Sequence, residues 1–379
     1  MLIQERRIAW LLPSAFYYWQ PSLSEFSKQF PQTKVFTGRW VGFARGYENT
    51  LDIEVVGERK VFRRTSKQQG YGSGFTYLSP SIIRSLFQFR PKLIFTCSFG
   101  IWTLLALLFK GFGGWRVVIV YEGSAPGVDF IHSPLRLLLR QLMMRAADGA
   151  ISNSQAGRNY LTEVLGGEKE RVLAYPFEIP SPKTWSHPVQ DQELSQFQFP
   201  HPIFLFVGRL LPRKGLHLLL EACHLLKQQG YNHFTVLVVG DGEQRQALET
   251  YCRDHELDDC IEWVGLVAYE KLSVYFECAD VFILPTLEDT WGVVVLEAML
   301  FGKPVFCSQG AGTAELIIDG ENGYVFDPKQ PQQLAKLMAN AIALPDQISL
   351  MAAKSRQTIA QYTPEAAAQF LAQVVAAIA

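Results

Sequence analysis

Long apolar runs are missing from this chain of 379 residues. The longest candidate, residues 99–109, is interrupted by Lys110 directly after it. It is shorter than the run of about 20 apolar residues that a membrane-spanning helix needs. The opening segment MLIQERRIAWLLPSA has two arginines, no long apolar region and no clear cleavage site. We therefore expect a first strand here and not a signal peptide. The sequence predicts a cytoplasmic protein without a membrane span.

Cysteine is scarce, and no two cysteines form a CxxC pair. The six cysteines stand at positions 97, 223, 252, 260, 278 and 307. This scatter is typical of small buried side chains in a reducing compartment. It gives no reason to expect a structural metal site.

Each half of the chain is poor in charge of one sign. Residues 1–185 hold 23 lysines and arginines against 13 acids, and the remainder holds 12 against 23, which leaves the net charge at −1. A basic half joined to an acidic half indicates that the two halves meet different partners. The basic half either faces an anionic membrane surface or an anionic acceptor, or its cations are only solvated.

Short apolar runs alternate with helical patterns in both halves, which predicts parallel sheets covered by helices. The length also exceeds one ordinary domain and fits two. The expected strands are residues 7–12, 34–37, 93–97, 116–121 and 149–152 in the first half, and 203–207, 234–239, 261–264, 280–284 and 304–307 in the second. The fold class is therefore α/β with two doubly wound domains.

Six prolines interrupt residues 176–202 and break both periodicities, so we place an interdomain linker at residues 179–202. It separates an N-terminal domain (1–178) from a C-terminal domain (203–362). The tail, residues 363–379, is expected to form a helix that packs back on the N-terminal domain.

An amphipathic helix is predicted at residues 135–146, LRLLLRQLMMRA, with arginines at positions 136, 140 and 145. Such a helix either faces the core or anchors to a membrane. We expect it to face the core.

Two acids flank a strand–turn–helix junction in LPTLEDTWGVVVLEAML, residues 284–300. Asp289 lies in the turn, and Glu297 lies roughly 6 Å along the axis of the following helix. The helix N-terminus between them presents backbone N–H groups that suit a phosphate. Acids on both sides of a diphosphate site fit a nucleotide sugar, although an acid in a loop and another in a helix also occur at this spacing by chance.

Cations and glycines follow the other strands of this half. In LFVGRLLPRKG a strand ends at Gly208, and Arg209 and Lys214 flank the next loop, where they can neutralise a diphosphate. Strands also end near Gly240 and Gly265. The glycines permit tight turns beside a ligand, and GDGEQRQALE lacks the spacing of a dinucleotide fingerprint.

Several of these motifs occur in a familiar order: GRLLPRKG, GDGEQRQALE, VGLVAYEKLSVYFECADVFILPT, EDTWGVVVLEAMLFGKPV and GTAELIIDGENGYVF. Together they resemble the C-terminal domain of family 4 retaining glycosyltransferases. The resemblance covers residues 203–330 well and extends to residues 151–179, while the first 130 residues match in outline. It implies the GT-B fold, with two Rossmann-like domains that face a central cleft, one for the acceptor and one for the nucleotide-sugar donor.

The resemblance also implies roles for single residues. Glu297 takes the position that holds the ribose hydroxyls, and Asp289 takes the position that contacts the donor sugar, where the family usually has glutamate. Arg209 and Lys214 match the diphosphate-binding pair. The backbone of the segment Thr290, Trp291, Gly292, Val293 and Val294 is expected to bind phosphate.

The N-terminal half departs from the family pattern. No glycine pair follows the first strand, and the aromatic residues 16–19, Tyr17 among them, either line an acceptor site or pack in the core. The histidine common in the family after a strand such as RVVIVY is replaced by Glu122 in Tyr-Glu-Gly. Glu122 or the nearby His132 is a candidate polar contact to the donor sugar.

The resemblance implies a retaining transfer from a UDP- or GDP-linked sugar to a hydroxyl of a glycan or lipid-linked acceptor. No Asp-x-Asp tripeptide occurs, so we expect no metal. We also expect no other cofactor and no nucleic-acid partner. The basic N-terminal domain suggests peripheral contact with the inner membrane face. The alternatives are a catalytically impaired nucleotide-sugar-binding protein, a sugar-nucleotide epimerase and a phosphorylase of the same fold.

Overall fold

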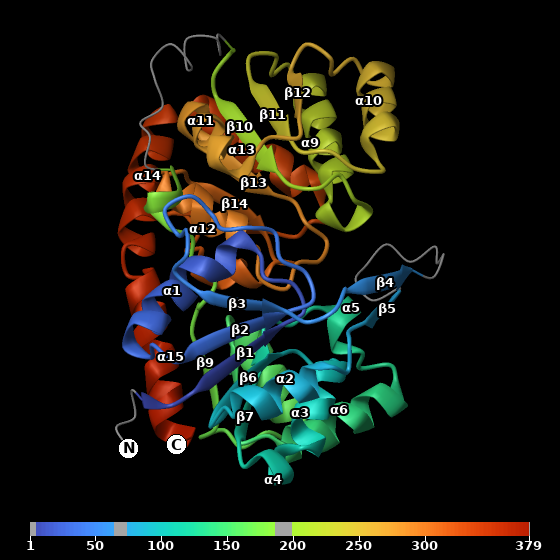
Figure 1. Cartoon of the computed structure of the whole chain (residues 1–379). Coiled ribbons are helices and arrows are strands. Elements are labelled where there is room, and N and C mark those ends of the chain that lie inside the picture. The colour runs from blue at the N-terminus through green and yellow to red at the C-terminus, as the bar shows by residue number, and fades with distance from the viewer. Residues whose placement is uncertain (1–4, 64–73, 186–198, 379) are drawn as a thin grey trace. The chain divides into compact units, whose positions relative to one another are not determined.

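The computed structural model describes residues 5–63, 74–185 and 199–378, and most of the expected linker, residues 186–198, lies outside them. The chain divides into two compact units (Figure 1). The first takes in the described parts of residues 1–184 together with residues 362–378. The second takes in the described parts of residues 185–361.

Seven strands among the described residues of the first unit form one parallel sheet in the order β3-β2-β1-β6-β7-β8-β9. They are β1 (Ile8–Leu12), β2 (Thr33–Thr37), β3 (Asp52–Val55), β6 (Leu93–Cys97), β7 (Arg116–Tyr121), β8 (Gly149–Ser152) and β9 (Val172–Ala174). A separate antiparallel ribbon pairs β4 (Lys60–Arg63) with β5 (Gly74–Tyr77). All five strands expected in this half form, with ends that shift by one residue at β1 and β2.

Helices cover both faces of the first sheet, which explains why its central strands are apolar on both sides. The helices of the first unit are α1 (Gln20–Gln29), α2 (Ile82–Phe89), α3 (Ile101–Leu108), α4 (Lys110–Gly113), α5 (Pro126–Asp129), α6 (Pro134–Ala146), α7 (Gln155–Asn159) and α15 (Pro364–Ile378). Trp10 packs edge-on against Trp19 and Phe26, whereas its neighbours Ala9 and Leu11 belong to the cluster under α2 and α3. The C-terminal helix α15 packs against α1 within this unit.

The second unit contains a parallel sheet whose six described strands run in the order β12-β11-β10-β13-β14-β15. They are β10 (Ile203–Val207), β11 (Thr235–Val239), β12 (Ile261–Gly265), β13 (Val281–Leu284), β14 (Val305–Ser308) and β15 (Gly323–Phe326). The helices are α9 (Leu216–Gln228), α10 (Arg245–Asp254), α11 (Leu272–Cys278), α12 (Val293–Leu300), α13 (Pro331–Ala343) and α14 (Pro345–Ile359). The five expected strands of this half are confirmed.

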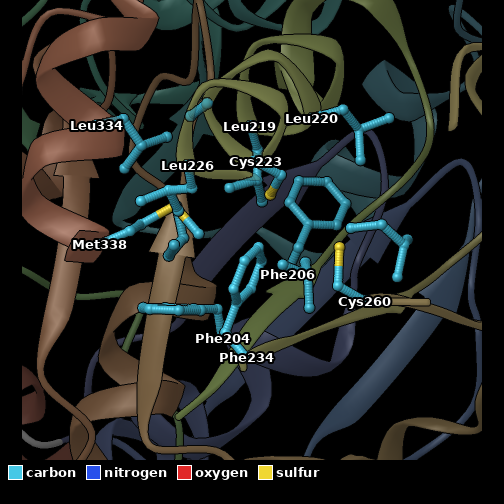
Figure 2. Close-up of a cluster of buried hydrophobic side chains, with 14 of the residues drawn as sticks. Phe204, Phe206, Leu219, Leu220, Cys223, Leu226, Phe234, Cys260, Leu334 and Met338 are labelled. Carbon is cyan, nitrogen blue, oxygen red and sulfur yellow. The ribbon is translucent and has the colours of Figure 1, made fainter. Parts of the chain in front are cut away.

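The core of the second unit forms where α9 and α13 cover the sheet. Figure 2 shows Phe204 and Phe206 from β10 beneath Leu219, Cys223 and Leu226 from α9. All six cysteines are free, and four are buried as expected, at positions 223, 252, 260 and 307. Those at positions 97 and 278 are only partly buried, so the expectation of burial is wrong for them.

The helix expected at residues 135–146 forms as α6, but of its five leucines only Leu137 packs against the core. Leu135, Leu138, Leu139 and Leu142 are exposed. Its inner face instead carries Arg140, Met143 and Met144. The physical reason is a buried polar site for the arginine: Arg140 Nη1 donates to the hydroxyl of Tyr160 at 2.9 Å.

Candidate functional site

Three predicted glycines lie side by side at the carboxyl edge of the second sheet. Gly208 N donates to the carbonyl of Val239 at 2.9 Å, and Gly240 N donates to the carbonyl of Gly265 at 2.8 Å. A Cβ on Gly240 would lie 1.9 Å from the carbonyl oxygen of Gly208. Gly240 is therefore required by the close approach of the Gly208 backbone, whereas the space beside Gly265 is open within 4 Å. All three glycines leave bare backbone at the edge where parallel sheets bind ligands.

The loop after β10 carries the predicted cations. Arg209 is exposed, whereas the side chain of Lys214 is only 14% exposed. Gly215 ends the loop with a positive φ of 69°. A Cβ there would lie 2.0 Å from the carbonyl oxygen of Pro285, so the loop passes directly over the end of β13.

The loop after β13 is anchored to this cation loop by the backbone of Arg213. Its carbonyl accepts bonds from the hydroxyl of Thr286 at 2.8 Å and from Leu287 N at 2.7 Å. In return, Arg213 Nη1 donates to the carbonyl of Glu288 at 3.1 Å. The hydroxyl of Ser308 secures the same loop by donating to the carbonyl of Thr286 at 2.6 Å.

This anchoring brings Lys214 and Asp289 together. Lys214 Nζ donates to Oδ2 of Asp289, and the carboxylate side chain is 9% exposed. Asp289 N donates to the carbonyl of Gly310 at 2.9 Å, which fixes its backbone. An ammonium group has three N–H donors, so Lys214 can hold Asp289 and still donate to an oxyanion.

Helix α12 begins at Val293, four residues beyond Asp289. Gly292 precedes the helix with a positive φ of 95° and, as a glycine, has no side chain with which to cap it. The indole of Trp291 is buried, so this residue can meet a ligand only through its backbone. The carbonyl of Trp291 accepts a bond from Thr313 N at 2.9 Å, which fixes the segment at the N-terminus, where Val293 and Val294 are half-buried. Such a helix N-terminus suits an anion.

Glu297 lies in the second turn of α12 and is 6% exposed. Burial raises the pKa of its carboxyl to about 7, and a hydrogen bond from Tyr269 opposes part of that rise. The hydroxyl of Tyr269 donates to Oε1 of Glu297 at 2.8 Å. The carbonyl of Tyr269 in turn accepts a bond from Trp185 Nε1 at 3.0 Å. The second unit thus holds an acid whose charge changes near neutral pH.

The candidates of the first unit are more dispersed. Glu122 directly follows β7 and its Oε1 accepts a bond from Cys97 Sγ at 3.4 Å. The hydroxyl of Tyr17 donates to the carbonyl of Val41 at 3.2 Å. His132 is exposed in the turn between α5 and α6. Of the neighbouring aromatic residues, Trp19 is a core residue. The roles proposed for Glu122, His132 and Tyr17 stay predictions.

Metal ligands do not gather in the described part of the chain. Within residues 5–63, 74–185 and 199–378, no three His, Cys, Asp or Glu side chains come close enough together to hold an ion. Independence from metal stays a prediction. In the same residues, no helix combines the length and the apolar character that a membrane span needs.

The second half of the chain is similar to known glycosyltransferases. Residues 191–365 match the family model described as glycosyl transferases group 1. Over 140 residues the chain is 36% identical to the amylovoran biosynthesis glycosyltransferase AmsK of Erwinia amylovora, covering 35% of this chain and 34% of that protein. Over 219 residues it is 26% identical to the 2-deoxystreptamine glucosyltransferase of Streptomyces kanamyceticus, covering 57% and 56%. The aligned parts thus span about a third and just over half of these relatives.

Solved structures match over nearly the whole chain. Anabaena Alr3699/HepE in complex with UDP aligns with a TM-score of 0.75 over 98% of this chain and 99% of that chain, at 17% identity. The chain has the GT-B fold. The same Anabaena protein in complex with UDP-glucose aligns with a TM-score of 0.72 at 18% identity. The GT-B fold expected from the sequence is confirmed.

Sequence reasoning missed three residues of this site. Tyr269 holds Glu297, and Arg213 and Thr286 lock the two loops together. Tyr269 stands in a quoted motif, VGLVAYEK, but nothing in the sequence signals which acid it reaches 28 residues away. Arg213 lies beside Lys214 and anchors the loop mainly through its backbone carbonyl. Because every residue has such a carbonyl, the residue type does not indicate this role.

Proposed function

We propose that this protein is a retaining glycosyltransferase that moves a sugar from a UDP-linked donor to a hydroxyl of a glycan or lipid-linked acceptor. One observation carries the proposal: the ion pair of Lys214 and Asp289 and the buried Glu297 flank the N-terminus of α12 at the carboxyl edge of a parallel sheet. The group 1 match supports transfer of a sugar. The UDP and UDP-glucose complexes of the Anabaena structure support the choice of donor.

In this proposal the donor lies along the loop–helix junction. The N-terminus of α12 and Lys214 bind the diphosphate, with Arg209 at the exposed end of the cation loop. Glu297, in its ionised form, accepts hydrogen bonds from the ribose hydroxyls. Asp289 contacts the hydroxyls of the sugar. Because aspartate is one methylene shorter than glutamate, this position influences which donor sugar is accepted.

In the proposed transfer, negative charge develops on the diphosphate as it leaves the sugar. The bond between C1 of the sugar and the diphosphate oxygen breaks, and the acceptor oxygen bonds to C1 on the same face. The departing diphosphate takes the proton of the acceptor hydroxyl. Fixed positive groups at Lys214 and the helix N-terminus stabilise the negative charge that grows on the leaving group.

We also propose that the reaction needs no metal ion, since these fixed charges do the electrostatic work. Turnover measured in excess EDTA should equal turnover in untreated enzyme. Loss of activity in EDTA and its return on addition of manganese would contradict this part of the proposal.

The test of function is a donor screen that follows nucleotide release and product mass by mass spectrometry. Purified protein is incubated with UDP- and GDP-linked sugars and a mixture of glycan and lipid-linked acceptors. Lys214→Ala should remove most turnover. Lys227→Ala is the matched control, because Lys227 is also an ion-paired lysine of the second unit, with 18% of its side chain exposed.

The outcome separates the proposal from its alternatives. A new glycosylated product with release of the nucleoside diphosphate supports transfer. Conversion of the donor without an acceptor indicates an epimerase. Tight binding of UDP with neither hydrolysis nor transfer to any acceptor overturns the proposal in favour of a binding protein.

A further inference from the structure

Helix α6 of the first unit exposes a continuous apolar stripe. Leu135, Leu138, Leu139 and Leu142 follow one another at spacings of three, one and three residues, so they share one face of the helix. All four are exposed, and Leu135 reaches 79%. An exposed apolar face of this kind marks an interaction surface.

The stripe faces outward because the opposite side of α6 is fixed by buried contacts. Arg140 Nη1 donates to the carbonyl of Asp129 at 3.2 Å and to the hydroxyl of Tyr160 at 2.9 Å. Its guanidinium also lies over the rings of Phe99 and Phe130. Turning α6 to bury the leucines would strip this arginine of its partners, which is costly for a buried charge.

Exposed apolar side chains also lie on two neighbouring helices. Helix α3 packs against α6, and Lys110 Nζ of α4 donates to the carbonyl of Ala146 at the end of α6 at 3.0 Å. Leu108 at the end of α3 is 63% exposed, and Phe112 on α4 is 84% exposed. We call these two residues and the four leucines of α6 the apolar face.

Cations border the apolar face. Arg136 and Arg145 are exposed on α6 itself. On the side of α4, Phe112 also lines a pocket of about 570 Å³ that contains Arg7, Arg90 and Lys92, and the described residues around it include no acid. An apolar centre with a basic border matches an anionic lipid surface, where apolar side chains enter the interface and cations bind the headgroup phosphates.

We propose that the apolar face docks the first unit on an anionic lipid bilayer and that the basic pocket binds one lipid headgroup. The surplus of ten positive charges in residues 1–185 favours this occupant. It also disfavours a second copy of the chain, because a pairing through this face would bring like charges together. The proposal goes beyond glycosyl transfer and does not depend on it.

Vesicle flotation of the full chain tests the proposal. One set of vesicles is phosphatidylcholine alone, and in the other a third of the lipid is phosphatidylglycerol. The variants are Leu135→Gln/Leu139→Gln for the apolar face and Arg90→Gln/Lys92→Gln for the pocket. Leu350→Gln on α14 of the second unit, where the leucine is 72% exposed, and the exposed Lys354→Gln are the matched controls.

The wild-type protein should float with the anionic vesicles only, and binding should weaken at about 0.5 M salt, which screens the charges. Each double variant should bind at least roughly tenfold more weakly, whereas both controls bind as wild type. Because all substituted side chains are exposed, thermal melting should stay unchanged in every variant.

Equal flotation of the wild-type protein with vesicles that contain phosphatidylglycerol and with those that lack it would overturn the proposal. Double variants that bind vesicles as tightly as wild type would also overturn it. Sedimentation velocity tests whether a second copy of the chain occupies the apolar face instead. If the wild type does not bind vesicles but forms a dimer that Leu135→Gln/Leu139→Gln dissociates, the apolar face is a contact between copies and the proposal is wrong. UDP titration of the same variants keeps this result separate from the test of glycosyl transfer.

Discussion

The ammonium group of Lys214 donates a hydrogen bond to the carboxylate of Asp289, 75 residues further along the chain. Both side chains are largely buried. Burial makes removal of one partner costly, because the other charge is left unpaired in a medium of low dielectric constant. The pair therefore holds the two loops together as well as placing a cation and an acid at the proposed donor site.

A double-mutant cycle measures this pair. Lys214→Ala and Asp289→Ala should each destabilise the fold by roughly 2–3 kcal/mol, and the double variant by clearly less than the sum. The comparison is the pair of Lys227 and Asp259, which is 2.6 Å long but has an aspartate side chain that is 64% exposed. Its coupling should stay below about 1 kcal/mol. Equal coupling in the two cycles, measured by urea unfolding, would contradict this assignment.

Stability should depend on pH through Glu297. Its pKa is raised from 4.5 to about 7 in the folded protein, so the folded state resists ionisation more than the unfolded state. The stability associated with the neutral form is complete below pH 4.5 and is lost as pH rises to about 7. Because glutamine does not ionise, Glu297→Gln should avoid this loss, which amounts to up to roughly 3 kcal/mol in the free energy of unfolding.

The measurement for Glu297→Gln is chemical unfolding at pH 5 and at pH 8 in wild type and variant. The variant should gain stability over the wild type at pH 8 and have little advantage at pH 5. Glu249→Gln on α10 is the control for removing a helix carboxylate. A variant with the same pH dependence as the wild type would rule out Glu297 as its source.

Tyr269 should set the pH at which the site binds nucleotide. If ionised Glu297 accepts the ribose hydroxyls, the Kd for UDP should rise below pH 7 by roughly five- to tenfold per pH unit. Tyr269→Phe removes the hydrogen bond that lowers the pKa of Glu297, so this rise should begin at higher pH. Tyr231→Phe is the control. A pH profile unchanged in Tyr269→Phe would show that the tyrosine does not act through Glu297.

Gly215 should tolerate no side chain. Gly215→Ala and Gly230→Ala both place alanine at positive φ, of 69° and 90°, but only at Gly215 would the Cβ meet backbone, 2.0 Å from the carbonyl oxygen of Pro285. Gly230→Ala should cost about 1–2 kcal/mol for its backbone conformation. Gly215→Ala should cost more and also weaken UDP binding, since the cation loop must move. Equal melting temperatures for the two variants would refute the close approach.

Much of the fold could be predicted because buried parallel strands are apolar throughout. The runs LIFTC and IFLFV became β6 and β10 without a shift. The short strands β3, β9 and β15 are not predicted from the sequence, and all three lie at sheet edges. Their pairing is decided by neighbouring strands and not by their own composition.

The candidate site could be predicted in part for a related reason. Asp289 and Glu297 belong to one local strand–turn–helix junction, so their spacing is visible in the sequence. The partners Lys214 and Tyr269 reach them across the fold, and such distant pairings follow only from the packed sheet. Helix α6 illustrates the same limit: its periodicity predicts an apolar stripe, but the buried contacts of Arg140 decide that the stripe faces outward.

The central claim is that the loop–helix junction around α12 binds a nucleoside diphosphate. Isothermal titration of UDP into wild-type protein and Glu297→Ala at pH 8 tests it most directly, because binding is measured without knowledge of the acceptor. The account predicts saturable binding to wild type and at least a roughly thirtyfold weaker Kd in Glu297→Ala, since hydrogen bonds to a charged acceptor are lost. Equal affinity in the two proteins, or no binding of UDP or GDP to wild type, would contradict it.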